Sequence, residues 1–90
     1  MYVVEAKYVA DAANKRQPFR AEHLERLGKL FAEGALVLAG AFDDLSASLL
    51  VLDVESPKAA EAIVKTDVFW NKKVWTGYTI RKLNQVDFDG

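Results

Sequence analysis

The side chain in this sequence best suited to exchanging protons near neutral pH is the single histidine, His23. It lies four residues after Phe19 and four before Leu27, so a helix through this segment places the imidazole along the inner edge of an apolar stripe. Two interpretations follow. The ring is either a core histidine that binds a backbone carbonyl, or an acid/base group that faces a crevice.

Asp67 is the candidate partner of that histidine. It precedes a strongly aromatic stretch, Phe69, Trp70 and Trp75, which would line an apolar wall. Its carboxylate is either a local cap that binds nearby backbone donors, or an orienting group that holds one imidazole nitrogen and stabilises the protonated ring. Spacing along the chain does not place His23 and Asp67 together, so the pair is a hypothesis.

Other chemistries have weaker signals. Ser48 opens a predicted strand, and the sequence has no Gly-x-Ser-x-Gly turn to activate a serine nucleophile. Gly40 marks a β-bulge, a close approach of the backbone to a ligand, or a plain packing requirement. With no cysteine and one histidine, the chain has no thiolate nucleophile and cannot build a multi-histidine metal site alone. We expect no metal and no other cofactor.

The first half of the chain predicts a strand and a helix. Residues 2–9 alternate charged and apolar side chains with the period of a strand. Residues 11–17 are polar and lack periodicity. A helix is predicted from Pro18 to Gly34, since proline suits the first turn and glycine suits the residue after the last. Its apolar stripe has three- and four-residue spacing and comprises Phe19, Leu24, Leu27, Leu30 and Phe31.

The second half predicts a hairpin, a helix and a strand. Residues 35–42 and 48–54 are apolar runs joined by a short polar connection, which is typical of an antiparallel pair. Ser56 and Pro57 read as the N-cap and first residue of a helix that ends near Thr66. Residues 74–83 alternate as a final strand, and residues 84–90 are expected to form a weakly ordered tail.

This order of elements predicts one α+β domain over residues 1–90, with the ferredoxin-like βαββαβ arrangement. Both helices would cover one face of an antiparallel sheet and leave an apolar, partly aromatic face open to water or a partner. Ninety residues without a disulfide bury little surface, so covering that face with a second copy is a natural remedy. We expect a homodimer.

Composition excludes several classes of protein. Hydrophobic residues make up 51% and charged residues 28%, the balance of a folded globular chain. A net charge of -1 with mixed signs offers no basic stripe for nucleic acid. Neither a signal-like segment nor an apolar run of bilayer length is present, so we expect a cytoplasmic protein with no membrane partner.

Four motifs in order resemble the YCII-related proteins over nearly the whole chain. They are R-x-x-H-L within residues 20–27, L-x-G within 38–42, S-L-L-V within 48–56 and D-x-F within 66–69. The resemblance implies a ferredoxin-like fold that dimerises through its sheets as a dimeric α+β barrel. It also implies that a histidine and an aspartate, here His23 and Asp67, face a pocket.

The resemblance extends to residues that would bind a ligand. Arg20 and Ser48 match shared positions and would contact an anionic or hydroxylated ligand, with Gly40, Phe69 and Trp70 as further candidate contacts. Family members usually carry Asp-Pro-Phe where this chain has Val68 in the middle position. That departure implies a looser turn behind the aspartate.

The activity associated with this family is dehydrochlorination of a chlorinated hydroxyhydroquinone in aromatic catabolism, and related dimeric barrels include muconolactone isomerases. The resemblance therefore implies a cofactor-free lyase or isomerase for a small hydroxylated aromatic. His23 would remove a proton from a ring hydroxyl so that electron density expels chloride, and Asp67 would stabilise the imidazolium. Two alternatives are a non-catalytic module that binds a ligand or partner with the same cavity, and a purely structural dimer whose cavity is too small for a ring.

Overall fold

A computed structural model describes residues 1–89 of the protein, and in it four strands form one antiparallel sheet. In chain order these are β1 (Tyr2–Tyr8), β2 (Leu36–Ala41), β3 (Ala47–Leu52) and β4 (Trp75–Lys82). Their order across the sheet is β2-β3-β1-β4, so β1 and β3 are central and β2 is an edge strand. This arrangement confirms the predicted α+β ferredoxin-like fold.

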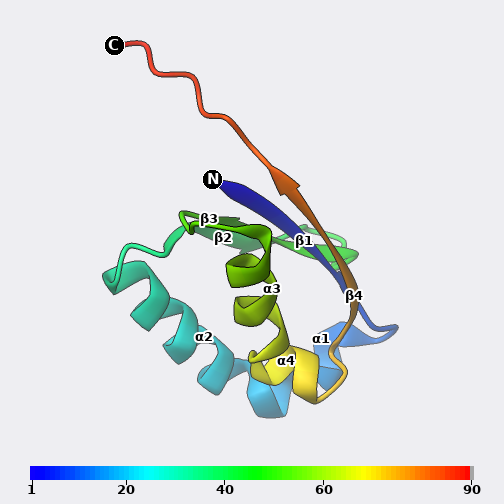
Figure 1. The fold of residues 1–90 in the computed structure, drawn as a ribbon. Helices are drawn as coiled ribbons and strands as arrows, with labels where there is room; N and C mark the ends of the chain where they lie inside the picture. The colour runs from blue at the N-terminus through cyan, green and yellow to red at the C-terminus, as the bar shows by residue number, and fades with distance from the viewer. Residues whose placement is uncertain (90) are drawn as a thin grey trace.

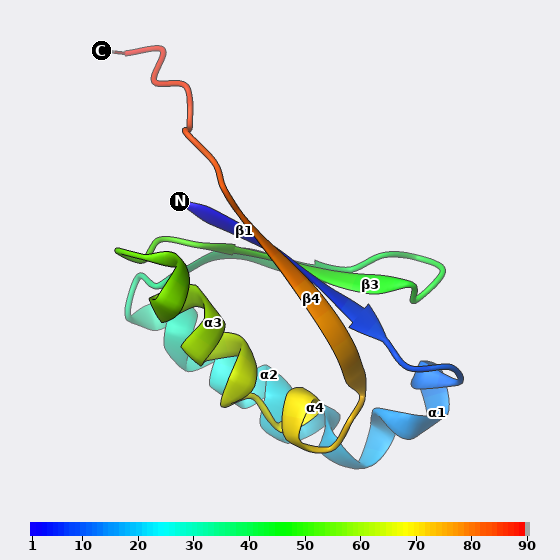
Figure 2. The same cartoon turned by 45° about the vertical axis from the view of Figure 1, so that its right-hand side comes forward.

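Two main helices and two single-turn helices lie on one face of this sheet (Figures 1 and 2). The main helices are α2 (Gln17–Ala32) and α3 (Pro57–Lys65). The short ones are α1 (Ala12–Lys15), which precedes α2, and α4 (Val68–Asn71), which follows α3. The opposite face of the sheet carries no helix, as Figure 2 shows.

The core lies between the central strands and α3, and its pattern follows from the sequence. In β1, Val4 and Ala6 are buried while Glu5, between them, is exposed, which is the period-two alternation expected of a strand. On α3, Ala60 and Val64 are four residues apart and both are buried. Burial of these aliphatic side chains from water is the main favourable term that holds the layers together.

Both predicted signals at the helix ends are confirmed. Gly34 has a φ of 83° and ends α2 in the left-handed conformation that glycine adopts without a steric penalty. The backbone N–H of Ala35, just beyond it, bonds to the carbonyl of Leu30. At the start of α3, the Ser56 side chain accepts a hydrogen bond of 3.1 Å from the backbone N–H of Ala59.

Helix α2 is less deeply buried than its sequence predicts. Leu24 is 46% exposed and Phe31 is 64% exposed, so two members of the expected apolar stripe face outward. The other three members are partly buried against the core: Phe19, Leu27 and Leu30. Helix α2 packs mainly on β2, the edge strand, and on α4, so the sheet is too narrow to cover the whole stripe.

The one-turn helices were not predicted. Helix α1 falls in the segment read as polar and aperiodic, and α4 falls in the connection between the second helix and the last strand. A single turn is too short to display a period of 3.6 residues, so it leaves no amphipathic pattern in the sequence. Asp11, in the left-handed conformation, precedes α1 and accepts a hydrogen bond from the Asn14 side chain.

The chain beyond β4 has no helix or strand between Leu83 and Asp89 and runs away from the body of the fold in Figures 1 and 2. The backbone N–H of Leu83 still bonds to the carbonyl of Met1 at 2.8 Å. The predicted weakly ordered tail over 84–90 stays a prediction, and residue 90 lies outside the described residues. Over residues 1–89, no helix is long and apolar enough to cross a membrane.

The core predicts a sharp contrast between two leucines. Leu52→Ala, at a fully buried position of β3, should lower the free energy of unfolding by about 2–5 kcal/mol because it leaves a cavity. Leu83→Ala, in the exposed segment after β4, should change it by less than about 0.5 kcal/mol. Urea unfolding followed by tryptophan fluorescence measures both, and equal losses would contradict this assignment of the core.

Candidate active site

A cavity of about 150 Å³ opens between α2 and the part of the sheet formed by β2, β3 and the end of β1. Its apolar wall includes Leu24, Leu27, Leu50 and Phe69. Its polar lining comprises Tyr8, Arg16, Arg20, His23 and Ser48. Because apolar cavities of this size in other proteins hold benzene, the space is sufficient for a single aromatic ring.

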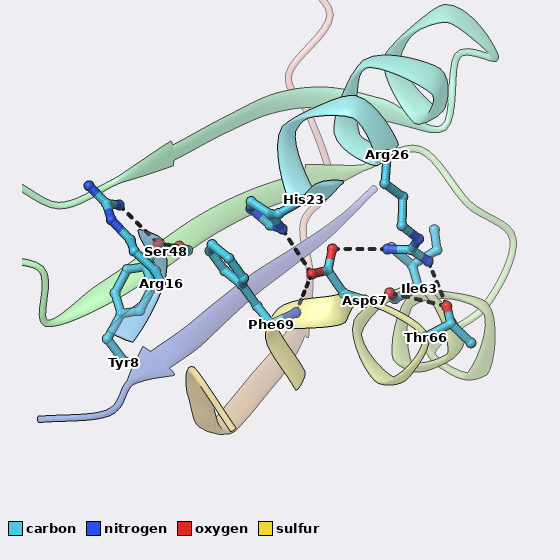
Figure 3. A network of polar contacts seen from close by, with 9 residues as sticks. All are labelled: Tyr8, Arg16, His23, Arg26, Ser48, Ile63, Thr66, Asp67 and Phe69. Atoms are coloured by element: carbon cyan, nitrogen blue, oxygen red, sulfur yellow. Dashed lines mark hydrogen bonds and ion pairs between the residues drawn. The ribbon is translucent and has the colours of Figure 1, made fainter. Parts of the chain in front are cut away.

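A buried hydrogen bond between His23 and Asp67 lies behind this cavity (Figure 3). His23 Nδ1 is 2.8 Å from Asp67 Oδ1, although 44 residues separate the two in sequence. Only 1% of the Asp67 side chain is exposed to solvent. The structure therefore brings together the two groups that the sequence singled out separately.

The Asp67 carboxylate has two further donors. Its Oδ1 also accepts the backbone N–H of Phe69 at 2.8 Å, and its Oδ2 accepts Arg26 Nη1 at 3.1 Å. Arg26 also donates to the hydroxyl of Thr66, just before Asp67. A buried carboxylate is costly unless paired and hydrogen-bonded, and these contacts provide both.

The two interpretations of Asp67 are therefore compatible. The residue is the N-cap of α4 through its bond to the Phe69 N–H, and the same oxygen binds His23. Val68 occupies the first position of α4, where a backbone N–H has no partner within the helix. Proline would suit that position. Here Val68 occupies it, and the Asp67 carboxylate is held by His23, Arg26 and the Phe69 N–H.

The His23 ring is fixed by aromatic contacts as well. Phe69 stacks on its face with centroids 3.8 Å apart and planes at 9°. Trp75 meets it edge-on, with centroids 5.3 Å apart and planes at 90°. These neighbours and the bond to Asp67 leave the imidazole little rotational freedom.

The second ring nitrogen of His23 is the one available for chemistry. Among residues 1–89 no hydrogen bond to Nε2 is found, while the ring itself borders the cavity. Since Asp67 can only accept when ionised, the network assigns the proton of the neutral imidazole to Nδ1. The lone pair on Nε2 can then accept a proton from a ligand, and Asp67 stabilises the imidazolium that results.

A second polar cluster borders the same cavity, and sequence analysis missed two of its members. Ser48 Oγ donates to the Tyr8 hydroxyl at 2.8 Å, and Arg16 Nη1 donates to the same oxygen at 3.5 Å (Figure 3). Tyr8 lies at the end of a strand, and Arg16 lies in the segment read as aperiodic, so neither carried a local signal. Ser48 was the only member of this cluster that the sequence indicated, because it matches a position shared in the family.

Of the other predicted contact residues, the structure places four at the cavity and one elsewhere. Arg20, Ser48, Gly40 and Phe69 line the cavity with His23. Trp70 does not, because it lines a separate hollow beside β4 and packs on Tyr78 at 5.3 Å between centroids. Phe69 and Trp70 are adjacent on a one-turn helix, so their side chains point in different directions.

Gly40 lies exposed in the edge strand, and a Cβ built there would meet no atom within 4 Å. The irregularity in the β2–β3 pairing falls between Leu36 and Leu38, so of the alternatives for Gly40 the bulge is wrong. Within the described chain, no group of three His, Cys, Asp or Glu side chains is placed to hold a metal ion.

Comparisons with known proteins identify the family and match the fold. Residues 1–84 match the model of the YCII-related domain. The chain belongs to the YCII-related family. A solved structure of 5-chloro-2-hydroxyhydroquinone dehydrochlorinase (TftG) from Burkholderia phenoliruptrix AC1100, in complex with 2,5-dihydroxybenzoquinone, is similar in fold, with a TM-score of 0.80. The match covers 94% of each chain at 19% sequence identity, which shows a shared fold. A search of curated proteins gives no match.

The polar network of this YCII-related protein predicts the tautomer of His23. In the native protein, neutral His23 should carry its proton on Nδ1. In Asp67→Asn, the Arg26 cation should keep the amide oxygen at the Oδ2 position, so the amide nitrogen takes the place of Oδ1. That nitrogen donates to Nδ1 at the cost of the bond from the Phe69 N–H, and the proton of the imidazole should move to Nε2. Nitrogen-15 NMR shifts of the ring distinguish the two forms. Asp44→Asn, at the exposed hairpin, is the matched control and should leave the ring shifts unchanged. An Nε2–H tautomer in the native protein would contradict the network.

Proposed function

We propose that this protein is a cofactor-free lyase or isomerase that moves protons on a small hydroxylated aromatic compound. His23 is the general base, and Asp67 is the residue that orients its ring and stabilises its protonated form. The single observation behind the proposal is the buried 2.8 Å hydrogen bond between His23 Nδ1 and Asp67, in a residue whose ring borders a cavity. An orienting carboxylate, an imidazole and an adjacent cavity of ring size are together the parts of a general-base site.

Electrostatics support the role of the pair. When Nε2 takes a proton, the positive charge forms beside a carboxylate that is removed from water, where charges interact strongly. The positive charge of Arg26 already compensates the negative charge of Asp67 before His23 takes up a proton. The buried carboxylate therefore does not depend on the imidazolium for its compensating charge. Asp67 therefore holds the base in place while Arg26 compensates the charge of the carboxylate.

Dehydrochlorination of a chlorinated hydroxyhydroquinone is the reaction we propose in particular. One ring hydroxyl loses its proton to His23, and the carbon that bears chlorine takes up a proton. A second hydroxyl then loses its proton as chloride leaves, and a hydroxyquinone remains. The net loss is HCl, so no external electron acceptor is required. The bound quinone of the dehydrochlorinase with the same fold supports this choice of substrate class.

A non-catalytic binding module would use the same cavity, and one assay separates the two functions. Chloride release or quinone absorbance on mixing with chlorinated hydroxyhydroquinones indicates catalysis, whereas saturable binding without product indicates a binding module. A purely structural role is disfavoured because the cavity has the volume of a single ring.

We also propose that the protein is a homodimer through the bare face of its sheet. Cross-strand partners share a face, so the pairs Val3 with Val51 and Leu38 with Val51 place these side chains together, opposite the helices. Leu49 lies on the same face, and with Leu38 and Phe42 it lines a shallow apolar hollow there. An apolar patch of this kind on so small a domain is suited to a second copy.

The function predicts a large kinetic effect of one substitution. His23→Ala should lower turnover of a chlorinated hydroxyhydroquinone by roughly 10²–10⁴-fold, the usual contribution of a positioned general base. His23→Asn should lose as much, because its amide can still bond to Asp67 but cannot take the proton. Chloride release measures turnover, and circular dichroism checks that both variants fold. Undiminished turnover in the asparagine variant would remove His23 from the mechanism.

The dimer predicts a change in mass. The native protein should elute at about twice its chain mass of 10.0 kDa in size exclusion with light scattering. Leu38→Asp, at a position 57% exposed on the bare face, should yield monomers because it places a charge in the interface. Leu83→Asp, 45% exposed beyond the sheet, is the matched control and should stay dimeric. A monomeric native protein would refute the proposal.

A further inference from the structure

We infer that the cavity has a second functional pole, an oxyanion site formed by Arg16 and the Tyr8 hydroxyl, which selects anionic ring compounds. This inference rests on the proposed function for the class of ligand. It assigns to Arg16 and Tyr8 the role of binding a negatively charged oxygen while His23 acts on another part of the same ring.

Arg16 is a partly buried cation with unused donors. Its Nε is fully buried and has no hydrogen-bond partner within residues 1–89. No carboxylate of the described chain forms an ion pair with it. Within residues 1–89 its guanidinium forms one hydrogen bond, the long 3.5 Å bond to the Tyr8 hydroxyl, and a cation–π contact 5.9 Å from the centroid of the Tyr8 ring, although a guanidinium has five N–H groups. A cation in this state at a cavity wall is stabilised by an anion that enters the cavity.

Tyr8 has its oxygen occupied and its proton free. The hydroxyl oxygen accepts from Ser48 Oγ at 2.8 Å and from Arg16. Ser48 is buried, so that bond is shielded from water, and Phe69 contacts the Tyr8 ring edge-on at 6.2 Å between centroids. With two donors directed at it, the Tyr8 hydroxyl is left to donate its own proton to a further acceptor. The cavity that Tyr8 lines is where a ligand oxygen would receive it.

The charge of the cavity favours the same ligand. Its lining carries two guanidinium groups, from Arg16 and Arg20, and no carboxylate. Asp67 lies behind His23 and is balanced by Arg26. Phe69, stacked on His23 and in edge contact with Tyr8, separates the two poles along one wall (Figure 3). A matching ligand is a single ring with a proton donor near His23 and an oxyanion near Arg16.

Phenolate and carboxylate oxygens share this chemistry, so the test uses one probe of each kind and a neutral probe. The probes are 2,5-dihydroxybenzoquinone, whose hydroxyls are acidic as vinylogous acids, 4-hydroxybenzoate, and uncharged hydroquinone. Binding is measured by calorimetry at neutral pH and low salt. Arg16→Met keeps the apolar stem and removes the charge, Arg16→Lys keeps the charge, and Tyr8→Phe removes the hydroxyl. Lys58→Met, at an exposed position of α3, is the control for loss of one positive charge.

We expect the native protein to bind at least one anionic probe more tightly than hydroquinone. Arg16→Met should weaken that anion about tenfold or more, with hydroquinone changed by less than about twofold, because charge-assisted bonds are the strong ones. Tyr8→Phe should weaken the anion by a smaller factor, Arg16→Lys should recover part of the affinity, and Lys58→Met should match the native protein. The better anionic probe identifies the source of the oxyanion.

The inference is overturned if Arg16→Met binds the anions as tightly as the native protein, if neither anion is preferred over hydroquinone, or if all probes weaken equally. These outcomes leave the proposed function standing whenever the His23 variants lose turnover. Conversely, suppose that the native protein turns over no phenol but still prefers anions through Arg16. The proposed function would then be wrong, and the oxyanion site would stand.

Discussion

The burial of one carboxylate, that of Asp67, is the constraint on which the arrangement of this protein depends. A charge removed from water needs compensating donors, and here they come from two helices: His23 and Arg26 on α2, and the Phe69 backbone on α4. These bonds fasten α2 to the turn that follows α3. The fold and the site therefore share their central interaction, and loss of the carboxylate would disturb both.

The same carboxylate explains how a domain this small holds a base in a defined orientation. Asp67 fixes Nδ1 of His23, and by capping α4 it also fixes the Phe69 ring that stacks on the imidazole. Asp67 thus fixes one edge of the imidazole through its own hydrogen bond and one face through the position of Phe69. Pre-organisation of this kind comes from short local bonds and does not need a large surrounding structure.

The sequence predicts what is encoded locally and fails where distant residues meet. The strand alternation, Gly34 and Ser56 are local signals, and each led to a correct element or boundary. His23 was expected to point inward from helical spacing alone. Its bond to Asp67 joins residues 44 apart, and no local pattern contains it. Trp70 was misplaced because α4 is one turn long, so its periodicity, and with it the direction of neighbouring side chains, was not readable.

The two poles of the cavity come from different parts of the chain, and this separation has a consequence for specificity. His23 and Asp67 lie within the R-x-x-H-L and D-x-F motifs, whereas Tyr8 and Arg16 lie outside all four motifs of the resemblance. A substitution at the second pole leaves the bonds of Asp67 untouched, because Tyr8 and Arg16 make none of them. Under the proposed function, proton transfer and ligand charge therefore depend on separate side chains of this cavity. At 19% identity the similarity to the dehydrochlorinase is one of fold, so the ligand of this cavity follows from its own lining residues.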